Sequence, residues 1–233
     1  MIVGLGNPGR EYAGTPHNIG FAVANELVER WGLGPAKDRF RGRIAEGRVR
    51  TGAPGASLGV GSAGGAAGAG GSGGAPAGTS APRVAVLCPQ TYMNDAGRSV
   101  GPARGALKLP LDRVLVVHDE IDLPFGDVRT RLGGGLAGHN GLKSLKRELG
   151  GADFMRVRVG VGRPNSTDPE IVSAYVLGRF RQDPDQVREL VERASEQVER
   201  VVLGDAVTGA PGAPASGDAT DAPAGDATPG QGR

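Results

Sequence analysis

One histidine and one aspartate in this sequence have the chemistry needed for acid–base catalysis. Asp119 lies in the run Val116-Val117-His118-Asp119-Glu120-Ile121-Asp122-Leu123-Pro124, where an apolar strand ends in a group of ionisable side chains. The ends of buried strands are favoured active-site positions in α/β sheets. A carboxylate there can orient an imidazole, and we expect that imidazole to be His17. A histidine with a pKa of about 6.5 can act as a base at neutral pH.

His118 is the competing candidate for the base. It stands next to Asp119, at the end of the same predicted strand. A histidine at such a position more often packs or forms a hydrogen bond, because acid–base catalysis needs an open position. We therefore expect His118 to have a structural role.

Two further loops carry polar side chains that folding does not require. The first, Gly4-Leu5-Gly6-Asn7-Pro8-Gly9-Arg10-Glu11-Tyr12, leads to Thr15-Pro16-His17-Asn18. It can be a plain glycine-rich turn with Asn18 capping a helix. A dinucleotide fingerprint is disfavoured, because Pro8 interrupts it and the third glycine is missing. The second loop, Pro89-Gln90-Thr91-Tyr92-Met93-Asn94, places an aromatic ring beside an amide. That pair suits stacking on a nucleotide, although Asn94 can equally cap the next helix.

A run of glycines precedes another predicted helix. Gly133-Gly134-Gly135-Leu136-Ala137-Gly138 leads to His139-Asn140. Backbone N–H groups at such a helix start can approach an anion, although the run can also be a flexible hinge with a polar cap. Basic residues gather around it: Arg129, Arg131, Lys143, Lys146, Arg147, Arg156, Arg158 and Arg163. Positions 129/131 and 156/158 alternate, so each pair shares one face of a strand and can form a platform for phosphates.

The elements that must position these residues alternate between strands and helices. This order predicts an α/β domain with a mostly parallel or mixed sheet. Apolar, β-branched runs predict strands at residues 2–5, 42–50, 83–88, 114–117, 127–132 and 155–161. Apolar residues at helical spacing predict helices at 19–31, 139–149 and 184–203, the last with Asp183 as its N-cap. In the segment 94–107, two glycines and Pro102 interrupt the helical pattern.

Two segments have compositions that do not support a folded core. Residues 52–82 are mostly glycine and alanine, with no charged or aromatic side chain, and residues 204–233 form an acidic tail of similar composition. We expect both to be disordered, because neither can bury enough apolar surface to offset its ordering entropy. The insertion would then be a swollen hairpin loop between neighbouring strands. What remains is one domain, 1–203, interrupted at 52–82.

Charge and cysteine content limit the classes of partner and compartment. The chain carries 27 basic and 25 acidic residues; without the tail these become 26 and 21, a net charge of +5. This excess permits a nucleic-acid partner. A single cysteine, Cys88, excludes an intrachain disulfide and a cysteine metal cluster, which favours a reducing compartment. No stretch is apolar enough to span a membrane and the N-terminus begins with a strand, so we expect a soluble, unprocessed, cytoplasmic protein.

Several motifs together resemble one known family. The segments VGLGNPGREYAGTPHNIGF, PQTYMN, VVHDEIDLPFGDVR and RLGGGLAGHNGLKS, followed by FMRVRVGVGRP, are similar to bacterial-type peptidyl-tRNA hydrolases and stand in the same order. The resemblance covers residues 2–50 and 83–203. It implies a monomeric α/β domain with a mixed, twisted sheet flanked by helices, needing no cofactor and no metal. Such an enzyme hydrolyses the ester between a peptide and the 3′-terminal ribose of tRNA, recycling tRNA from interrupted translation.

The resemblance also implies roles for individual residues. His17 would be the general base toward the attacking water, Asp119 would hold and polarise His17, and Asn7 would contact the substrate near the scissile ester. The positions implied to contact tRNA around its terminal nucleotide are Tyr12, Tyr92, Asn94 and Asn140, and those implied to grip phosphate are Arg131 and Arg158. These residue types fit such roles, because an amide can bind a developing oxyanion and a neutral histidine beside an ionised aspartate is a workable base.

The sequence departs from the family pattern in the 52–82 insertion, in the tail after residue 204, and in having arginine where the family has lysine at 131. Two other classes of function stay open. A relative that only binds RNA is one, since a fold can serve either role, but His17 and Asp119 are both present. An enzyme that processes small nucleotides on the glycine run is the other, but the run lacks the Lys-Ser/Thr pair of a P-loop.

Overall fold

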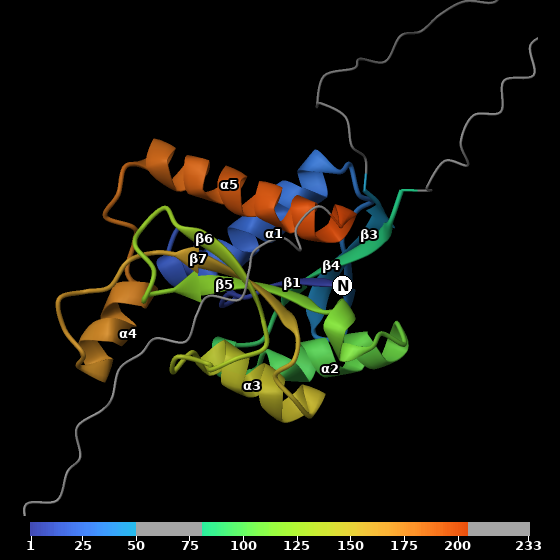
Figure 1. The fold of residues 1–233 in the computed structure, drawn as a ribbon, viewed down its shortest axis with the longest axis horizontal. Coiled ribbons are helices and arrows are strands. Elements are labelled where there is room, and N and C mark those ends of the chain that lie inside the picture. The colour runs from blue at the N-terminus through green and yellow to red at the C-terminus, as the bar shows by residue number, and fades with distance from the viewer. Residues whose placement is uncertain (50–80, 205–233) are drawn as a thin grey trace, which may run out of the picture.

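One mixed sheet organises the part of the chain that the structure, a computed structural model, describes: residues 1–49 and 81–204 (Figure 1). Across these ranges, seven strands are joined in the order β2-β3-β4-β1-β5-β7-β6. The strands are β1 (Ile2–Gly4), β2 (Lys37–Arg39), β3 (Gly42–Arg48), β4 (Arg83–Pro89), β5 (Leu115–Glu120), β6 (Val128–Leu132) and β7 (Met155–Gly160).

The centre of the sheet is parallel and its two sides are antiparallel. Strands β4, β1, β5 and β7 run in the same direction. The pairs β2–β3, β3–β4 and β6–β7 are antiparallel. The predicted fold class, an α/β domain with a mixed sheet flanked by helices, is confirmed.

Helices cover both faces of the sheet. The helices are α1 (Ile19–Arg30), α2 (Gly97–Ala106), α3 (Asn140–Leu149), α4 (Pro169–Leu177) and α5 (Pro184–Leu203). Figure 1 shows α1 and α5 on one face and α2 and α3 on the other, with α4 beyond one end of the sheet. Each face has its own buried core, one around Trp31 and Leu190 and the other around Phe154 and Leu145.

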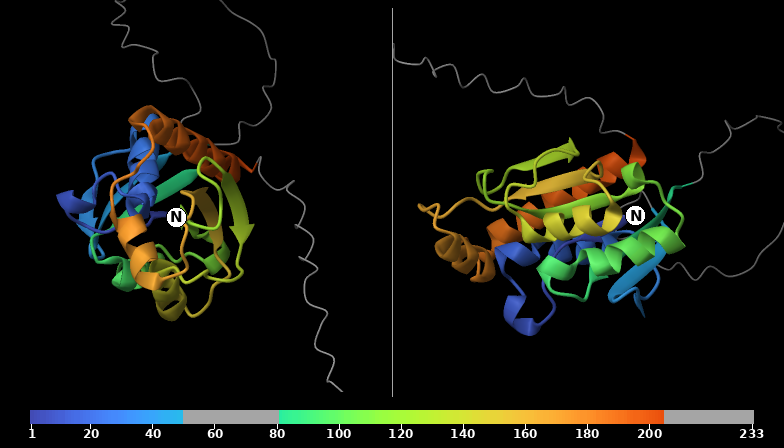
Figure 2. Two further views of the ribbon diagram at one scale, coloured as in Figure 1. Left: turned by 90° about the vertical axis from the view of Figure 1, so that its left-hand side faces the viewer. Right: turned by 90° about the horizontal axis from the view of Figure 1, so that it is seen from below.

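Short 3₁₀ helices connect several of these elements: η1 (Arg10–Tyr12), η2 (Pro16–Asn18), η3 (Met93–Asp95) and η4 (Leu111–Arg113). The turned views in Figure 2 show α4 at the end of the layered body, away from α2 and α3. α4 contacts η2, so the turn that carries His17 lies against this helix. The fold thus gathers η2 and α4 at the same end of the sheet.

The sequence prediction needs correction at four elements. Strand β5 continues through Glu120, so His118, Asp119 and Glu120 belong to the strand and not to a loop after it. The interrupted segment 94–107 does contain a helix, because Val100 and Ala103 of α2 pack in the core despite Pro102. β2 and α4 were not predicted, and α4 begins with the same Asp-Pro pair, Asp168-Pro169, that begins α5.

The predicted hairpin around the insertion is confirmed as far as the described residues go. β3 and β4 pair antiparallel from Gly42↔Pro89 to Arg48↔Arg83. Residues 50–80 and 205–233, which hold almost all of the insertion and the tail, lie outside the described residues. Their predicted disorder therefore stays a prediction. No helix in the described ranges is long and apolar enough to cross a membrane.

Candidate active site

The polar segments found in the sequence meet at one edge of the sheet. β4, β1 and β5 are adjacent and parallel, so their carboxyl ends lie side by side. β1 leads into the loop with Asn7, β4 leads into Tyr92 and Asn94, and β5 ends with Asp119 and Glu120. This edge is where open α/β sheets form ligand sites.

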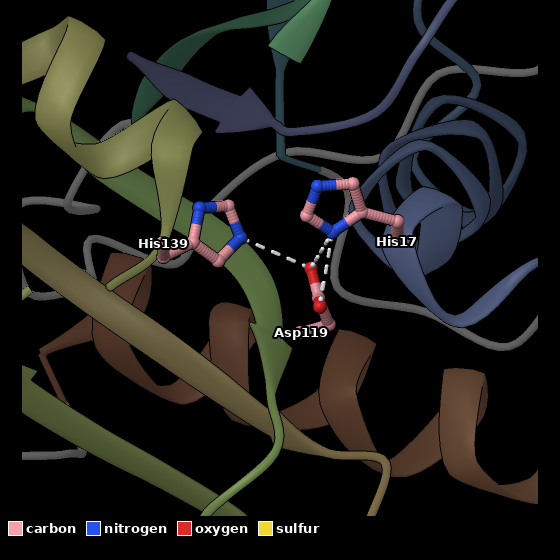
Figure 3. Close-up of side chains that lie close together, drawn as sticks. All are labelled: His17, Asp119 and His139. Atoms are coloured by element: carbon pink, nitrogen blue, oxygen red, sulfur yellow. Dashed lines mark hydrogen bonds and ion pairs between the residues drawn. The ribbon is translucent and has the colours of Figure 1, made fainter. Parts of the chain in front are cut away.

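His17 reaches Asp119 from the turn before α1. Its Nδ1 lies 3.0 Å from Oδ1 and 3.1 Å from Oδ2 of Asp119. The approach depends on Gly20, because a Cβ there would lie 2.5 Å from the backbone of Leu5 and from the carbonyl oxygen of Val117. The start of α1 can therefore sit directly against the ends of β1 and β5. The Nε2 of His17 points away from Asp119 (Figure 3).

A second imidazole, that of His139, shares the same carboxylate. Its Nε2 lies 3.0 Å from Oδ1 of Asp119. Its Nδ1 accepts hydrogen bonds from the N–H groups of Gly141 at 3.1 Å and Leu142 at 3.4 Å, so His139 is the N-cap of α3. Because Nδ1 is an acceptor, the proton of His139 must be on Nε2, where it is donated to Asp119. Both rings thus direct an N–H at one carboxylate.

The electrostatics of this group favour an ionised Asp119. Burial raises the pKa of Asp119, but the charges of and hydrogen bonds from His17 and His139 outweigh it and hold this pKa well below its usual range. Burial lowers the pKa of His17, but the charge of Asp119 and the hydrogen bond to it raise that pKa above its ordinary value of 6.5. The pair is therefore a carboxylate that holds its proton-accepting neighbour in a more basic form.

His118 has the structural place that the sequence predicts. Its side chain is 1% exposed, and its Nδ1 donates to the backbone carbonyl of Asp119 at 2.7 Å. Its ring packs edge-on against that of His139, with the centroids 5.0 Å apart. Burial, followed by the neighbouring His139, lowers the pKa of His118 to about 3. This imidazole is closed off from solvent, unlike that of His17.

Asn7 is fixed on three sides by hydrogen bonds. Its backbone N–H donates to Oδ1 of Asn18 at 2.8 Å, and its carbonyl accepts from Nδ2 of Asn18 at 2.9 Å. Its side-chain Oδ1 accepts from the N–H of Met93 at 2.7 Å. The alternative in which Asn18 caps α1 is wrong, because its side chain holds the Asn7 loop and makes no capping bond. Because Oδ1 is occupied, the Nδ2 of Asn7 is left as the group that can donate to a ligand.

These residues line one cavity of about 840 Å³. Its polar lining includes Asn7, His17, Asp119, Asn94 and Asn140, and Tyr92 lies at its wall. Asn94 makes no capping bond at η3 or α2, so the capping alternative for it is also wrong. Tyr92 is 59% exposed, which leaves its ring accessible for stacking. α4 supplies an apolar side of the cavity with Val172 and Val176.

The remaining expected site residues lie outside this cavity lining. Tyr12 is half-buried in η1, and Arg131 and Arg158 lie on β6 and β7. Position 129 pairs with 158 and position 131 with 156, so the four arginines share one face of the sheet as expected. Their situations differ, however, because Arg158 donates from Nε to the buried carboxylate of Glu120 at 3.0 Å. Arg131 is exposed.

The group of His17, Asp119 and His139 also has the composition of a metal site, with ligand atoms within 4.8 Å of one another. A metal ligand must offer an unprotonated lone pair. The Nε2 of His139 carries its proton, since Nδ1 accepts from the start of α3. The hydrogen bonds therefore suit a proton-holding network better than a metal centre.

Comparison with known proteins assigns the family. A model of the peptidyl-tRNA hydrolase family matches residues 1–58 and 67–210. The chain is 45% identical over 183 residues to the peptidyl-tRNA hydrolase of Geobacter sulfurreducens, covering 78% of each. It is 37% identical over 206 residues to that of Bdellovibrio bacteriovorus, covering 87% of this chain and 92% of the relative. This chain belongs to the peptidyl-tRNA hydrolase family.

A solved structure supports the same assignment. The crystal structure of peptidyl-tRNA hydrolase from Acinetobacter baumannii is similar with a TM-score of 0.67 and 32% identity, over 88% of each chain. The sequence analysis placed the whole 52–82 insertion and the tail after residue 204 outside the family pattern. The family model leaves a smaller part unmatched: only residues 59–66 inside the insertion, and the tail only after residue 210.

The sequence did not predict the role of every site residue. No role was predicted for His139, although it is one of three histidines in the chain and directly precedes a helix after a glycine run. That combination is the signal that could have selected it. Asn18 and Glu120 were likewise missed as partners of Asn7 and Arg158.

Proposed function

We propose that this chain hydrolyses the ester between the peptide and the 3′-terminal ribose of peptidyl-tRNA with His17 as its general base. As a member of the peptidyl-tRNA hydrolase family, the chain is an ester hydrolase that acts in translation. The observation that carries the assignment of the base is the contact of His17 with the ionised Asp119 inside the cavity. Asp119 binds Nδ1, so the Nε2 of His17 is the nitrogen free to accept a proton.

The reaction then runs in two steps. A water molecule gives a proton to the Nε2 of His17 while its oxygen attacks the ester carbonyl carbon, which forms a tetrahedral intermediate. The intermediate collapses with cleavage of the bond to the ribose oxygen, and the imidazolium returns the proton to that leaving oxygen. Asp119 offsets the positive charge on His17 between the two steps. The products are the free peptide acid and tRNA with its 3′-terminal ribose hydroxyl.

Asn7 is the residue that we place next to the reacting ester. Its Oδ1 is held by the N–H of Met93, so its orientation is set before substrate arrives. Its Nδ2 can then donate a hydrogen bond to the carbonyl oxygen of the ester as negative charge develops on that oxygen. A donor that is fixed in advance stabilises a transition state without the cost of reorganisation.

For the tRNA, we propose contacts that spread outward from the ester. Asn94 and Asn140 line the cavity and would bind the terminal ribose and base, while the exposed ring of Tyr92 would stack on a base. Tyr12, Arg131 and Arg158 lie beyond the cavity and would contact more distant parts of the acceptor arm. The last two would grip a phosphate.

A mutational test of the base uses N-acetyl-aminoacyl-tRNA as substrate, with unblocked aminoacyl-tRNA as the comparison. We expect His17→Ala to lower kcat by roughly 10²- to 10⁴-fold, the range that a general base contributes, and to leave tRNA binding unchanged. His118→Ala is the matched control, because His118 makes its hydrogen bond to a backbone carbonyl and is closed off from the cavity.

Each alternative has a distinct result in this test. If His17→Ala keeps most of the activity while His118→Ala loses it, the assignment of the base is wrong. If the parent protein binds tRNA but releases no N-acetylated amino acid, the chain only binds RNA. Comparable release from blocked and unblocked substrates would contradict a preference for peptidyl-tRNA.

We also propose that residues 1–203 work as one domain, and that the protein is a cytoplasmic monomer. In support of the first, all described strands belong to one sheet with helices packed on both faces. The second rests on the family's role in translation and on the reducing compartment favoured by the cysteine content.

A further inference from the structure

A fully buried arginine lies behind the candidate site. Arg156 of β7 is 2% exposed, and its position pairs with Arg131 on the neighbouring strand. Arginine is almost never fully buried unless it is paired. Among the described residues Arg156 makes no ion pair; the nearby carboxylate of Glu120 binds Arg158 instead. Burial, followed by the charges of Arg158 and Arg131, lowers the pKa of Arg156, so this position is costly for a cation.

The guanidinium of Arg156 forms hydrogen bonds to backbone carbonyls. One terminal nitrogen donates to the carbonyl of Gly135 at 2.9 Å and the other to that of Gly133. Both carbonyls belong to residues 133–138, which we call the glycine loop. This arrangement uses the planar fork of arginine, which an ammonium group cannot reproduce. Arg156 is therefore not available to a phosphate in the way the sequence suggests.

The glycine loop spans a long distance across the face of the sheet. It leaves β6 at Leu132, which pairs with Met155 at the start of β7. It ends at His139, which reaches Asp119, a residue that pairs with Val159. Four residues of β7 separate these two points, or roughly 13 Å of strand. Arg156 lies on β7 between these two points and binds the loop through the carbonyls of Gly133 and Gly135.

The loop also has contacts of its own: the N–H of Gly133 donates to the carbonyl of Phe154 at 3.1 Å, and Leu136 packs against the core around Phe154. The backbone of the loop is left-handed at Gly133, Gly134, Ala137 and Gly138, with φ values of 60°, 87°, 46° and 76°. Such a chain has many alternative conformations, and Ala137 pays a steric cost for its own. Ala137 and Gly138 line the cavity directly before His139 and Asn140. A loop of this kind needs an anchor to place those side chains reproducibly.

We propose that Arg156 is a positioning residue that fixes the glycine loop and thereby places His139 against Asp119 and Asn140 in the cavity lining. The inference rests on the proposed function for its kinetic consequences only. Arg156 touches neither the cavity nor the exposed surface, so it acts through the two carbonyls. Arg131 lies against Gly134 of the same loop, so the anchor also sets the place of the candidate phosphate-binding residue.

The test compares Arg156→Met, which keeps the stem and loses the donors, with Arg156→Lys, which keeps the charge. Kinetics are measured on peptidyl-tRNA and on an N-acetyl-aminoacyl ester of adenosine, which has no tRNA phosphates. We expect Arg156→Met to lower kcat roughly 10- to 100-fold on both substrates, the range for catalytic groups misplaced by about an ångström. Its salt dependence should match the parent's, and Arg156→Lys should recover part of the loss.

A second readout needs no activity at all. Hydrogen–deuterium exchange at residues 133–142 should quicken in Arg156→Met, including the N–H groups of Gly141 and Leu142 that bind His139. Arg104→Met is the matched control, because Arg104 also donates to two backbone carbonyls: that of Leu109, which follows α2, and that of Leu149 at the C-terminal end of α3. It should leave both kcat and exchange in the loop unchanged.

Three results would overturn the proposal. Unchanged exchange at residues 133–142 in both Arg156 variants would show that the loop holds itself. A loss confined to KM on peptidyl-tRNA, with a reduced salt slope, would make Arg156 a phosphate contact. An equal loss of kcat in Arg104→Met would mean that any such arginine acts only through general stability. An inactive parent protein would instead overturn the proposed function, and the exchange result would still decide the role of Arg156.

Discussion

Asp119 accepts hydrogen bonds from two imidazoles (Figure 3), which reach it from the starts of α1 and α3 on opposite faces of the sheet (Figure 1). The two rings are not equivalent. His139 uses its other nitrogen to cap α3, which fixes its tautomer and its orientation. Among the described residues, the other nitrogen of His17, Nε2, has no hydrogen-bond partner, and His17 lines the cavity. One carboxylate therefore joins a ring that can exchange protons with substrate to a ring that holds the structure in place.

The pH dependence of the reaction follows from the pKa of His17. The neutral ring is the active base, so activity should rise as pH increases through this pKa. Asp119 raises the pKa against the effect of burial, and Asp119→Asn removes that charge. Burial then dominates, so we expect the half-activity pH of kcat/KM to move to lower values in Asp119→Asn. The plateau rate should also fall, since the ring is a weaker base and its charged form loses a partner.

Profiles of kcat/KM against pH for the parent and for Asp119→Asn measure both effects, and NMR titration of His17 measures its pKa directly. His139→Gln offers a control that keeps a donor to Asp119. A half-activity pH that stays fixed or rises in Asp119→Asn would contradict the assigned electrostatics. So would an NMR pKa of His17 that does not move with it.

At this scale the sequence predicted the meeting of His17 and Asp119, because a strand end collects carboxylates and few histidines are available to join them. The partnership of Asn7 with Asn18 and Met93 could not be predicted. It depends on how three separate loops pack, and a capping role explained Asn18 and Asn94 equally well from sequence alone. Local motifs with two valid explanations need the tertiary contacts to decide between them.

Among the elements, the β3–β4 hairpin has a well-defined end. Pairing continues to Arg48↔Arg83, the N–H of Val49 donates to the carbonyl of Pro82 at 3.0 Å, and Arg48 donates to that of Ala81 at 2.8 Å. The chain therefore leaves and rejoins the described structure at adjacent points. Nothing in the pairing of these strands requires a long connection.

Replacing residues 52–80 by a two-residue turn should leave turnover within a few-fold of the parent. The connection between residues 49 and 81 falls from 31 residues to four. That is about three doublings, so the lower loop-closure entropy should stabilise the protein by about 2 kcal/mol. Urea unfolding and hydrolysis of N-acetyl-aminoacyl-tRNA measure the two outcomes. A marked loss of stability or of turnover would show that the removed segment packs or binds substrate.

The element most important to the cavity and absent from the sequence prediction is α4. Most of its residues are apolar, but only Val176 is buried and Ile171 and Leu177 remain exposed, so the apolar residues form no one-sided helical pattern. The missed signal was the pair Asp168-Pro169 at the start of the helix. Asp168 accepts from the N–H of Glu170 at 2.8 Å, just as Asp183 accepts from the N–H of Asp185 at the start of α5. The Asp-Pro capping pair was therefore a better signal for this helix than hydrophobic periodicity, because α4 covers a cavity and not a core.

In the whole molecule, the cavity and the two arginines proposed to bind phosphate occupy different parts of the sheet. The cavity lies at the carboxyl ends of β4, β1 and β5, while Arg131 and Arg158 lie on β6 and β7 at one side. A substrate that uses both must be long and must carry phosphates away from its reacting end. A peptidyl-tRNA has this form. The sequence predicted that the arginines of β6 and of β7 share one face of each strand, but it did not predict that each has a different partner. Arg158 binds the carboxylate of Glu120, whereas Arg156 binds backbone carbonyls.

The last prediction separates Arg131 from Arg158. Arg131 is exposed, so Arg131→Ala should raise KM on peptidyl-tRNA and leave stability unchanged. Its log–log salt slope should fall by about one unit, the value for one phosphate contact. Arg158→Ala leaves the buried Glu120 without its partner, so it should also lower stability by roughly 1–3 kcal/mol.

The double variant Glu120→Gln with Arg158→Ala removes the unpaired charge, so it should recover stability but not KM. Arg200→Ala is the control, because Arg200 is exposed on α5, on the opposite face of the sheet. The adenosine ester has no phosphate to grip, so Arg131→Ala should react with it as fast as the parent does. Equal losses on the two substrates, or an unchanged salt slope, would mean that Arg131 supports the glycine loop and grips no phosphate. If the double variant recovers KM as well as stability, the loss in Arg158→Ala comes from the strand and not from a lost phosphate contact.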